Sequence, residues 1–262
     1  MSNYVNRQPP ENNHQAGSPL PEFFTLLAAV TLMLLALLLI LSQAVNYFGQ
    51  HVPFSWEQPF ALKWSEQRQA TPAQRKVEQL TERLLQQDPL PDPISITVTV
   101  LDNAEPNAFA GLGGEIVIHR GLLEALPNEN ALALVLAHEI AHVRQRHVVK
   151  TLTKAVGVGA ILAALGDGAG MVFQSTTEMS RLAFSREDEA QADELAVRML
   201  QRYYGHTEGA AALFEVLTSS TPQWLSSHPA SGVRRQGIMA HSATGTVTPL
   251  AADYLNFTID AQ

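Results

Sequence analysis

The amino-acid sequence predicts an α+β protein that is mostly helical, with a small antiparallel β-sheet and one N-terminal transmembrane helix. Three observations lead to this fold class. Several long segments place apolar residues at the three- and four-residue spacing of a helix. Residues 94–101 alternate apolar and polar side chains and are rich in β-branched residues, as strands are. Residues 23–41 are uncharged and nearly long enough to match the hydrocarbon core of a bilayer.

Composition limits the functions that the chain can perform. The formal net charge is −8, and the 17 lysines and arginines form no basic block, which argues against nucleic acid as a main partner. The chain contains no cysteine, so disulfides, thiolate metal ligands and a cysteine nucleophile are excluded. Any metal site must therefore use histidines and carboxylates. A length of 262 residues allows one large domain, or a smaller one with appendages.

The N-terminal part predicts a tail and a membrane anchor. Residues 1–22 are polar without apolar periodicity, which is typical of a disordered tail. Residues 23–44 are interpreted as a transmembrane anchor or an uncleaved signal, because the apolar run is longer than a usual signal core. A cleaved signal peptide is the alternative, since Ser42, Gln43 and Ala44 resemble a cleavage site.

The next segments predict a linker, a helix and a sheet. Residues 45–71 are interpreted as a juxtamembrane linker, and residues 72–87 repeat apolar side chains at helical spacing. Residues 94–101 form the first predicted strand. Residues 107–110 and 115–119 predict a hairpin beside it, because the glycines between them allow a tight turn and a close approach of the backbone.

A long central helix is predicted after the sheet. Residues 120–126 form a short helix, and Asn128 is a suitable N-cap for a helix that reaches about Leu152. Residues 155–173 are apolar but contain several glycines and one aspartate. We interpret them as a buried helical hairpin or an apolar flap at the membrane surface, with a second transmembrane helix as the less favoured alternative.

The C-terminal part predicts two further helices. Residues 175–203 are helical, in one piece or two, and Ser185 is a cap for the second piece. Gly205 ends this helix, and Thr207 begins an amphipathic helix that runs to about Leu217. Residues 221–262 are interpreted mostly as loop and short helix.

The central helix carries the sequence His138-Glu139-Ile140-Ala141-His142. Positions four residues apart lie on one helix face, so His138 and His142 can bind one metal ion. Glu139 lies close enough to act as a general base on a water at that metal. This pattern is typical of zinc peptidases and predicts one Zn²⁺ per chain. On a continuous helix His147 lies on the opposite face, so we expect it at the surface.

A third protein ligand is expected downstream, because catalytic zinc sites use three protein ligands. Position 148 is a valine, so the ligand is not six residues past the motif. Glu189 and Asp193 are four residues apart, and Glu189 can supply the ligand while Asp193 accepts the ring N–H of a ligand histidine. The alternative is a solvated acidic helix face. Alanines around the pair favour a packed helix instead.

Taken together, the motifs resemble those of the HtpX-like and CAAX-endopeptidase family, a group of gluzincin zinc metallopeptidases. They occur in order at residues 107–110, 113–118, 138–143, 185–193 and 228–234. The resemblance implies a zincin-type metallopeptidase domain, which we place at residues 72–262, and proteolytic activity. It also implies His138, His142 and Glu189 as zinc ligands and Glu139 as the catalytic base. The single predicted span is closest in layout to the periplasmic, BepA-like members.

The same resemblance suggests further site residues. His228 and Arg234 are the candidates for a second donor to the oxyanion, so His228 is expected to be catalytic and Arg234 to contact substrate. His228 could instead occupy the fourth zinc position in a resting state. Asn107, Phe109 and Gly114 lie where an extended peptide could add to the hairpin edge. A strand cap and a core aromatic are the alternative roles of Asn107 and Phe109.

The expected function is a membrane-anchored zinc endopeptidase in envelope protein quality control. We expect a single-pass protein of the bacterial inner membrane with a periplasmic catalytic domain. Its expected partners are protein or peptide substrates and the lipid bilayer, and no nucleic acid. The alternative is a catalytically silent zinc-binding chaperone or adaptor of the same fold. The presence of Glu139 argues against a silent protein, because a lost activity commonly loses the base.

Overall fold

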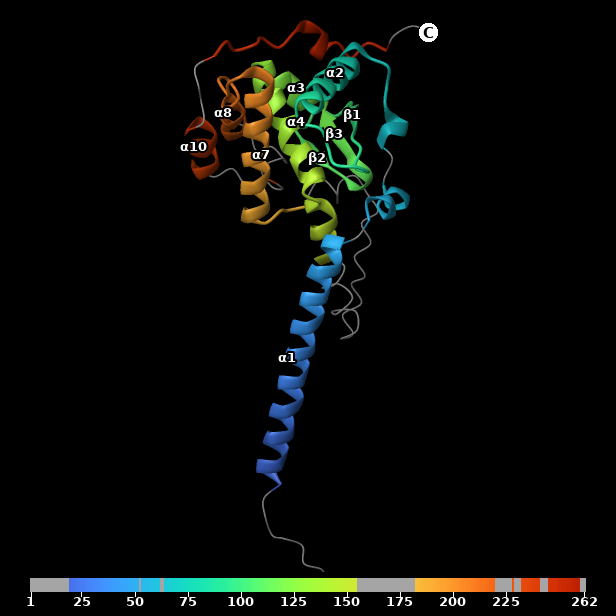
Figure 1. The fold of residues 1–262 in the computed structure, drawn as a ribbon, viewed down its shortest axis with the longest axis vertical. Helices are drawn as coiled ribbons and strands as arrows, with labels where there is room; N and C mark the ends of the chain where they lie inside the picture. The colour runs from blue at the N-terminus through green and yellow to red at the C-terminus, as the bar shows by residue number, and fades with distance from the viewer. Residues whose placement is uncertain are drawn as a thin grey trace, which may run out of the picture. The chain divides into compact units, whose positions relative to one another are not determined.

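A computed structural model describes most of the chain (Figure 1). The described residues are 19–51, 53–61, 64–154, 182–219, 228, 232–240 and 245–259. Most of the predicted tail at residues 1–22 and all of the apolar segment at residues 155–173 lie outside them. The chain divides into two units at residues 43 and 44, and each is described by itself.

The apolar N-terminal segment is a single long helix, α1, at Leu20–His51. Its part from Leu20 to Leu41 is strongly apolar, and none of its most apolar window is buried within the protein. At 1.5 Å per residue these 22 residues are about 33 Å long, close to the thickness of a bilayer core. Among the described helices this is the one that could cross a membrane by length and composition, a test that a signal sequence also passes.

The segment after α1 packs onto the folded domain. It contains three short 3-10 helices, η1 at Phe54–Trp56, η2 at Gln58–Phe60 and η3 at Trp64–Gln67. The indole of Trp64 is almost fully buried and meets the ring of Phe109 edge-on at 5.2 Å between centroids. The Ser65 hydroxyl donates to the Glu115 carboxylate at 3.0 Å. The stretch predicted as a linker therefore contributes Phe54 and Trp64 to the core, and its residues 45–51 belong to α1.

The sheet is small and mixed. Helix α2 at Pro72–Gln87 precedes strands β1 at Thr97–Leu101, β2 at Ala108–Ala110 and β3 at Glu115–His119. The strand order is β1-β3-β2, with β2 antiparallel to β3 and β1 parallel to β3. The predicted hairpin is confirmed, whereas a purely antiparallel sheet is wrong. After β1 the chain passes to the far side of the position of β3, forms β2 there, and then turns into β3. The alternation of apolar and polar residues along a strand does not indicate which path the connection takes.

A short 3-10 helix, η4 at Leu112–Gly114, makes the hairpin turn between β2 and β3. Gly113 and Gly114 both have positive φ angles, of 71° and 79°. A Cβ atom on Gly114 would lie 1.8 Å from the carbonyl oxygen of Ser95. Glycine is therefore required at position 114 so that two backbone segments can pass each other closely.

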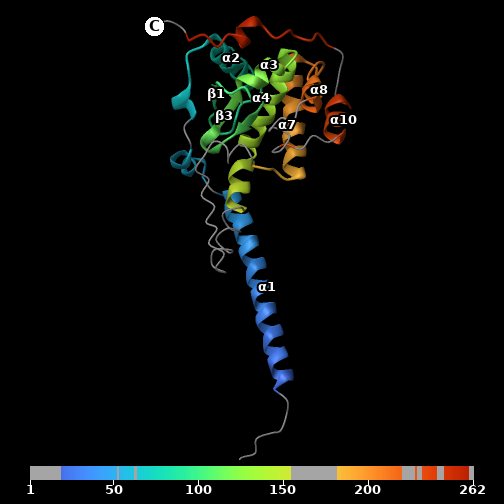
Figure 2. The same cartoon turned by 180° about the vertical axis from the view of Figure 1, so that it is seen from behind.

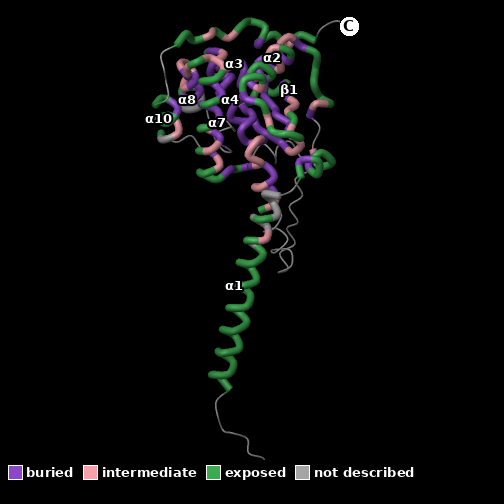
Figure 3. The backbone as a smooth tube through the Cα atoms, in the orientation of Figure 1, coloured by how far each residue is buried: buried purple, intermediate pink, exposed green. Residues whose placement is uncertain are grey.

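Helix α4 at Glu129–Arg144 is the centre of the domain and follows the short helix α3 at Arg120–Ala125. The predicted cap is confirmed, because the Asn128 side chain accepts a hydrogen bond from the Ala131 N–H at 2.8 Å. Both views of the ribbon place α4 between the sheet and helix α7 (Figures 1 and 2). It is buried over nearly its whole length (Figure 3). A helix that is apolar on all sides requires such an enclosed position.

Helix α4 ends earlier than predicted. The expected helix to about Leu152 breaks at Gln145 and Arg146, and residues 147–154 are helical again. Arg146 has a φ angle of 62°, which is uncommon for a residue other than glycine. Its guanidinium pairs with the carboxylate of Glu57 at 2.6 Å, so the segment before α2 holds this turn.

Helix α7 at Arg186–Tyr204 packs along α4 (Figure 1). The predicted N-cap is confirmed, because Ser185 and Asp188 form a capping box at the start of α7. Gly205 ends the helix in the left-handed conformation. The next helix, α8 at Ala212–Ser219, starts later than predicted, because Gly209 has a φ angle of 81° and separates Thr207 from it. Helix α10 at Gly232–Ala240 and the 3-10 helix η5 at Ala252–Leu255 follow.

The start of α4 is held by residues from the C-terminal part of the chain. The hydroxyls of Tyr204 and Tyr254 each donate to one oxygen of the Glu129 carboxylate, both at 2.9 Å. The Thr248 N–H donates to the side-chain oxygen of Asn130 at 2.8 Å. These contacts keep the helix that carries the His-Glu-x-x-His motif in a defined position relative to α7.

Candidate metal centre

The predicted site residues meet in one buried cluster between α4 and α7. Helix α4 supplies two histidines and a glutamate, α7 supplies two carboxylates, a loop supplies a third histidine, and α10 supplies an arginine. They are His138, Glu139, His142, Glu189, Asp193, His228 and Arg234. Residues four apart on a helix point to the same side, so the adjacent helices α4 and α7 bring His138 and His142 together with Glu189 and Asp193.

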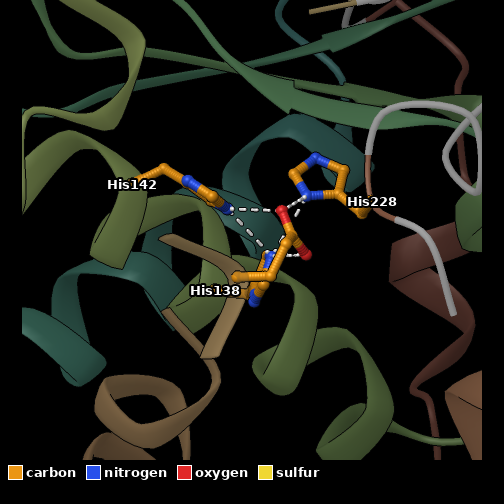
Figure 4. A group of neighbouring side chains, drawn as sticks. His138, His142 and His228 are labelled. Atoms are coloured by element: carbon orange, nitrogen blue, oxygen red, sulfur yellow. Dashed lines mark hydrogen bonds and ion pairs between the residues drawn. The ribbon is translucent and has the colours of Figure 1, made fainter. Parts of the chain in front are cut away.

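Four of these side chains form a set that could hold a metal ion. One ligand atom from each of His138, His142, Glu189 and His228 lies within 4.8 Å of every other. Figure 4 shows the three histidines converging from different directions. The Nε2 atoms of His138 and His142 are 3.0 Å apart, and the Nδ1 atom of His228 lies 3.2 Å from Nε2 of His138. A carboxylate oxygen of Glu189 lies 2.9 Å from Nδ1 of His228.

The spacing of these atoms suits zinc. Ligands about 2.0–2.1 Å from a tetrahedral zinc ion are roughly 3.4 Å from one another. The Glu189 oxygens lie 3.6 Å from Nε2 of His138 and 3.5 Å from Nε2 of His142, and the histidine distances are only slightly shorter. Nitrogen and carboxylate donors in such a set are those that zinc prefers. The side chains present therefore fit the ion.

Glu139 faces the same cluster without belonging to the ligand set. Its side chain is fully buried, and Oε1 lies 3.6 Å from Nε2 of His228. His228 thus presents Nδ1 to the ligand set and Nε2 to the Glu139 carboxylate. A carboxylate at this position can exchange a proton with a group bound between it and the ligands.

Asp193 and Arg234 form the outer layer of the cluster. Oδ1 of Asp193 lies 3.0 Å from Nδ1 of His138, a distance at which it can accept the ring N–H. The Arg234 guanidinium donates to both oxygens of Asp193, at 2.7 and 2.8 Å, and reaches Glu189 at 2.7 Å. Arg234, expected to contact substrate, is thus mostly buried against two carboxylates of α7.

The electrostatics of the cluster follow from burial and from these close partners. Burial lowers the pKa of His138, but hydrogen bonds to Asp193 and Glu189 outweigh it and raise the pKa to about 9. Burial holds the pKa of His142 well below its usual value. Burial would raise the pKa of both carboxylates, but the histidines lower that of Glu189 far below its usual range, and Arg234 and His138 lower that of Asp193 to about 2. Both carboxylates are therefore anionic at neutral pH.

Two residues at the cluster were not found by sequence reasoning. The ring of Phe184 stacks on the imidazole of His142, with centroids 3.9 Å apart. His147, expected at the surface, is fully buried, and its Nδ1 lies 3.1 Å from Nδ1 of His142. The expectation for His147 is wrong because α4 breaks before it. The positive φ of Arg146 turns the chain back toward the metal-binding face.

The three predicted substrate residues of the hairpin lie near the sheet rather than in the cluster. The side chain of Phe109 is in the core against Trp64, and that of Asn107 is fully buried, with no hydrogen-bond partner among the described residues. Gly114 packs against the backbone of Ser95. Strand β2 pairs with β3 on one side, and no described strand pairs with its other side. Contacts from β2 to a peptide would therefore be made through its backbone.

A helix that presents His-Glu-x-x-His beside a second helix that supplies a glutamate defines the class of metallopeptidases with an active-site metal. The profile of one such group, described as peptidase family M48, matches residues 72–241. Because this match covers more than half of the chain, the protein belongs to peptidase family M48.

Several bacterial proteases are similar to part of the chain. The beta-barrel assembly-enhancing protease of Escherichia coli (strain K12) is 33% identical over 150 residues, which are 50% of this chain and 31% of that protein. The metalloprotease YcaL of the same strain is 27% identical over 162 residues, 57% of this chain and 63% of YcaL. The metalloprotease LoiP is 32% identical over 144 residues, 50% of this chain and 57% of LoiP. The match to the first relative thus spans about a third of its length.

Proposed function

We propose that this protein is a membrane-anchored zinc endopeptidase. The observation that carries the proposal is the buried set of His138, His142 and Glu189 at tetrahedral spacing, with the Glu139 carboxylate beside it. Membership of a metalloprotease family supports it. The three side chains hold one zinc ion per chain, and Asp193 keeps the His138 ring in the correct orientation and tautomer.

The reaction requires a base, and Glu139 is placed to serve. Zinc held in this set would act as a Lewis acid, which would polarise a peptide carbonyl and lower the pKa of a water molecule enough for it to attack at neutral pH. Glu139 takes the proton of the attacking water and delivers it to the nitrogen of the leaving amine. Burial of the carboxylate keeps bulk water from competing for that proton.

His228 has two roles that fit its position. Its Nδ1 atom lies at ligand distance from the other donors, which suits a fourth zinc ligand in a resting state. Its Nε2 atom faces Glu139, and the same imidazole could instead donate to the oxyanion of the substrate. We favour the resting ligand for the arrangement described here, because Nδ1 is already inside the ligand set.

Protein substrates are proposed to bind along β2. The side of β2 that pairs with no strand among the described residues can pair with an extended peptide through backbone hydrogen bonds, which gives binding without strong sequence preference. Asn107 directly precedes β2, and its side-chain amide is fully buried. Phe109 and Gly114 could contact a bound peptide only through their backbone atoms, because the Phe109 side chain is in the core and glycine has no side chain.

The proposed location is the bacterial inner membrane. Residues 23–44, which lie within α1, are the proposed single-pass anchor, and residues 72–262 form the proposed periplasmic peptidase domain. One relative is named as a beta-barrel assembly-enhancing protease, which supports a role in envelope protein quality control. The expected substrates are misfolded or unassembled proteins of that compartment, and the bilayer is the other partner. A silent zinc-binding chaperone is not favoured, because Glu139 is present and faces the ligands.

Cleavage of an unfolded casein by the full-length protein in detergent tests the proposal. The wild type should cleave it, should lose activity to a zinc chelator and should regain it with zinc. Glu139→Gln should keep its zinc, because Glu139 is not a ligand, but lose about 10²–10⁴-fold in turnover. Glu194→Gln changes an exposed glutamate on α7 and serves as the control. A Glu139→Gln variant that cleaves like the wild type would remove Glu139 from the mechanism.

A further inference from the structure

His147 lies against the outer side of a proposed zinc ligand. His142 directs Nε2 toward the ligand set, and its other ring nitrogen, Nδ1, lies 3.1 Å from Nδ1 of His147. The two rings are steeply inclined, at 71° with centroids 5.0 Å apart, so each nitrogen can point at the other in the ring plane. The His147 side chain is fully buried, and the contact is shielded from water.

Metal binding determines where the protons of these two rings must be. A histidine that binds zinc through Nε2 carries its proton on Nδ1, so His142 must donate toward His147. His147 then accepts at Nδ1 and carries its own proton on Nε2. That nitrogen lies 3.4 Å from a carboxylate oxygen of Asp188 and 3.4 Å from the amide oxygen of Gln191, and both are acceptors. One consistent arrangement of protons therefore connects His142 to α7.

The backbone turn after α4 brings His147 into contact with His142. A continued helix would carry His147 to the face opposite His138, away from the cluster. The left-handed conformation of Arg146 breaks the helix and brings His147 back beside His142. The ion pair of Arg146 with Glu57, and its position over the ring of Phe54 at 5.6 Å, hold this turn.

We propose that His147 is a positioning residue of the metal centre, which accepts the Nδ1 proton of His142 and thereby orients this ligand. The inference rests on the proposed zinc set. It gives His142 the outer partner that Asp193 provides for His138, and both partners are tied to α7. The two ligands differ in one respect: His138 has a carboxylate behind it and His142 a neutral imidazole. Both histidines of the α4 motif are thereby connected to α7, the helix that supplies the third proposed ligand.

The test measures the zinc dissociation constant of the full-length protein in detergent, by competition with a chelator. His147→Leu fills similar space but offers no acceptor, and should weaken zinc binding about 10–100-fold. His147→Asn places an oxygen near the former position of Nδ1 and should restore most of the affinity. The absorption spectrum of the Co²⁺-substituted protein should change in His147→Leu and stay close to the wild type in His147→Asn.

His119 provides the matched control, because it is also a buried histidine, in the same core, with its Nδ1 bonded to the Glu105 carbonyl. His119→Leu and His119→Asn should leave zinc affinity unchanged. Zinc affinity within about twofold of the wild type in folded His147→Leu would overturn the inference. Equal losses in the Asn and Leu variants would also overturn it, and if His147→Leu does not fold, the same measurement on His147→Ala, which also lacks an acceptor, decides by the same criterion. A wild-type protein without stoichiometric zinc would instead overturn the proposed function.

Discussion

Replacing Asp193 by asparagine tests the outer layer of the metal centre on the side of His138. Asp193 accepts from the His138 ring through Oδ1, and both of its oxygens accept from the Arg234 guanidinium. Asparagine keeps one acceptor oxygen but replaces the other by an NH₂ group, which cannot accept from either neighbour. The variant must therefore lose a hydrogen bond to the ligand or to the arginine, and it removes one negative charge beside Arg234.

The size of the effect follows from these contacts. Loss of a partner behind a ligand histidine costs about 10–100-fold in metal affinity. The upper part of this range, roughly 50–100-fold or about 2.3–2.7 kcal/mol, is expected here, because the change disturbs two buried partners at once. Arg234 is also expected to move toward Glu189, which it already contacts at 2.7 Å, and to compete with zinc for that ligand.

The assay is chelator competition for zinc with purified full-length protein in detergent. Glu189→Ala, which removes a proposed ligand, sets the scale for complete loss of the site, and Glu194→Gln on the exposed face of α7 is the control. Zinc affinity in Asp193→Asn within about twofold of the control would refute the role given to Asp193. A larger loss in Asp193→Asn than in Glu189→Ala would show that the ligand has been misassigned.

Two further predictions concern His228 and the N-terminal helix. His228→Ala should raise peptidase activity if the imidazole is a resting zinc ligand, and lower it about 10²–10³-fold if it donates to the oxyanion; activity of the zinc-loaded variant within about twofold of the wild type would exclude both roles. The full-length protein should sediment with membranes and resist carbonate extraction, because α1 exposes apolar side chains over the length of a bilayer core. A mature N-terminus at Val45 would show that residues 23–44 are a cleaved signal instead.

Features that depend on neighbours along the chain could be predicted from the sequence. The caps at Asn128 and Ser185 and the stop at Gly205 follow from side chains that bond to backbone atoms within a few residues. The facing of His138 and His142 follows from helical spacing alone. Glu189 could be named as a candidate ligand because two inward carboxylates on a packed helix need a cation or a donor nearby. In the structure its oxygens lie 3.6 Å from Nε2 of His138 and 3.5 Å from Nε2 of His142.

Features that depend on where a helix breaks, or on which segments pack together, were decided only by the tertiary structure. The direction of β1 is set by the path of its connection, which leaves no mark on the alternation of its side chains. Arg234 turns to α7 because two buried carboxylates there attract it more strongly than solvent does. His147 reaches the metal centre because an ion pair between Arg146 and the distant Glu57 supports a backbone conformation that local propensity disfavours.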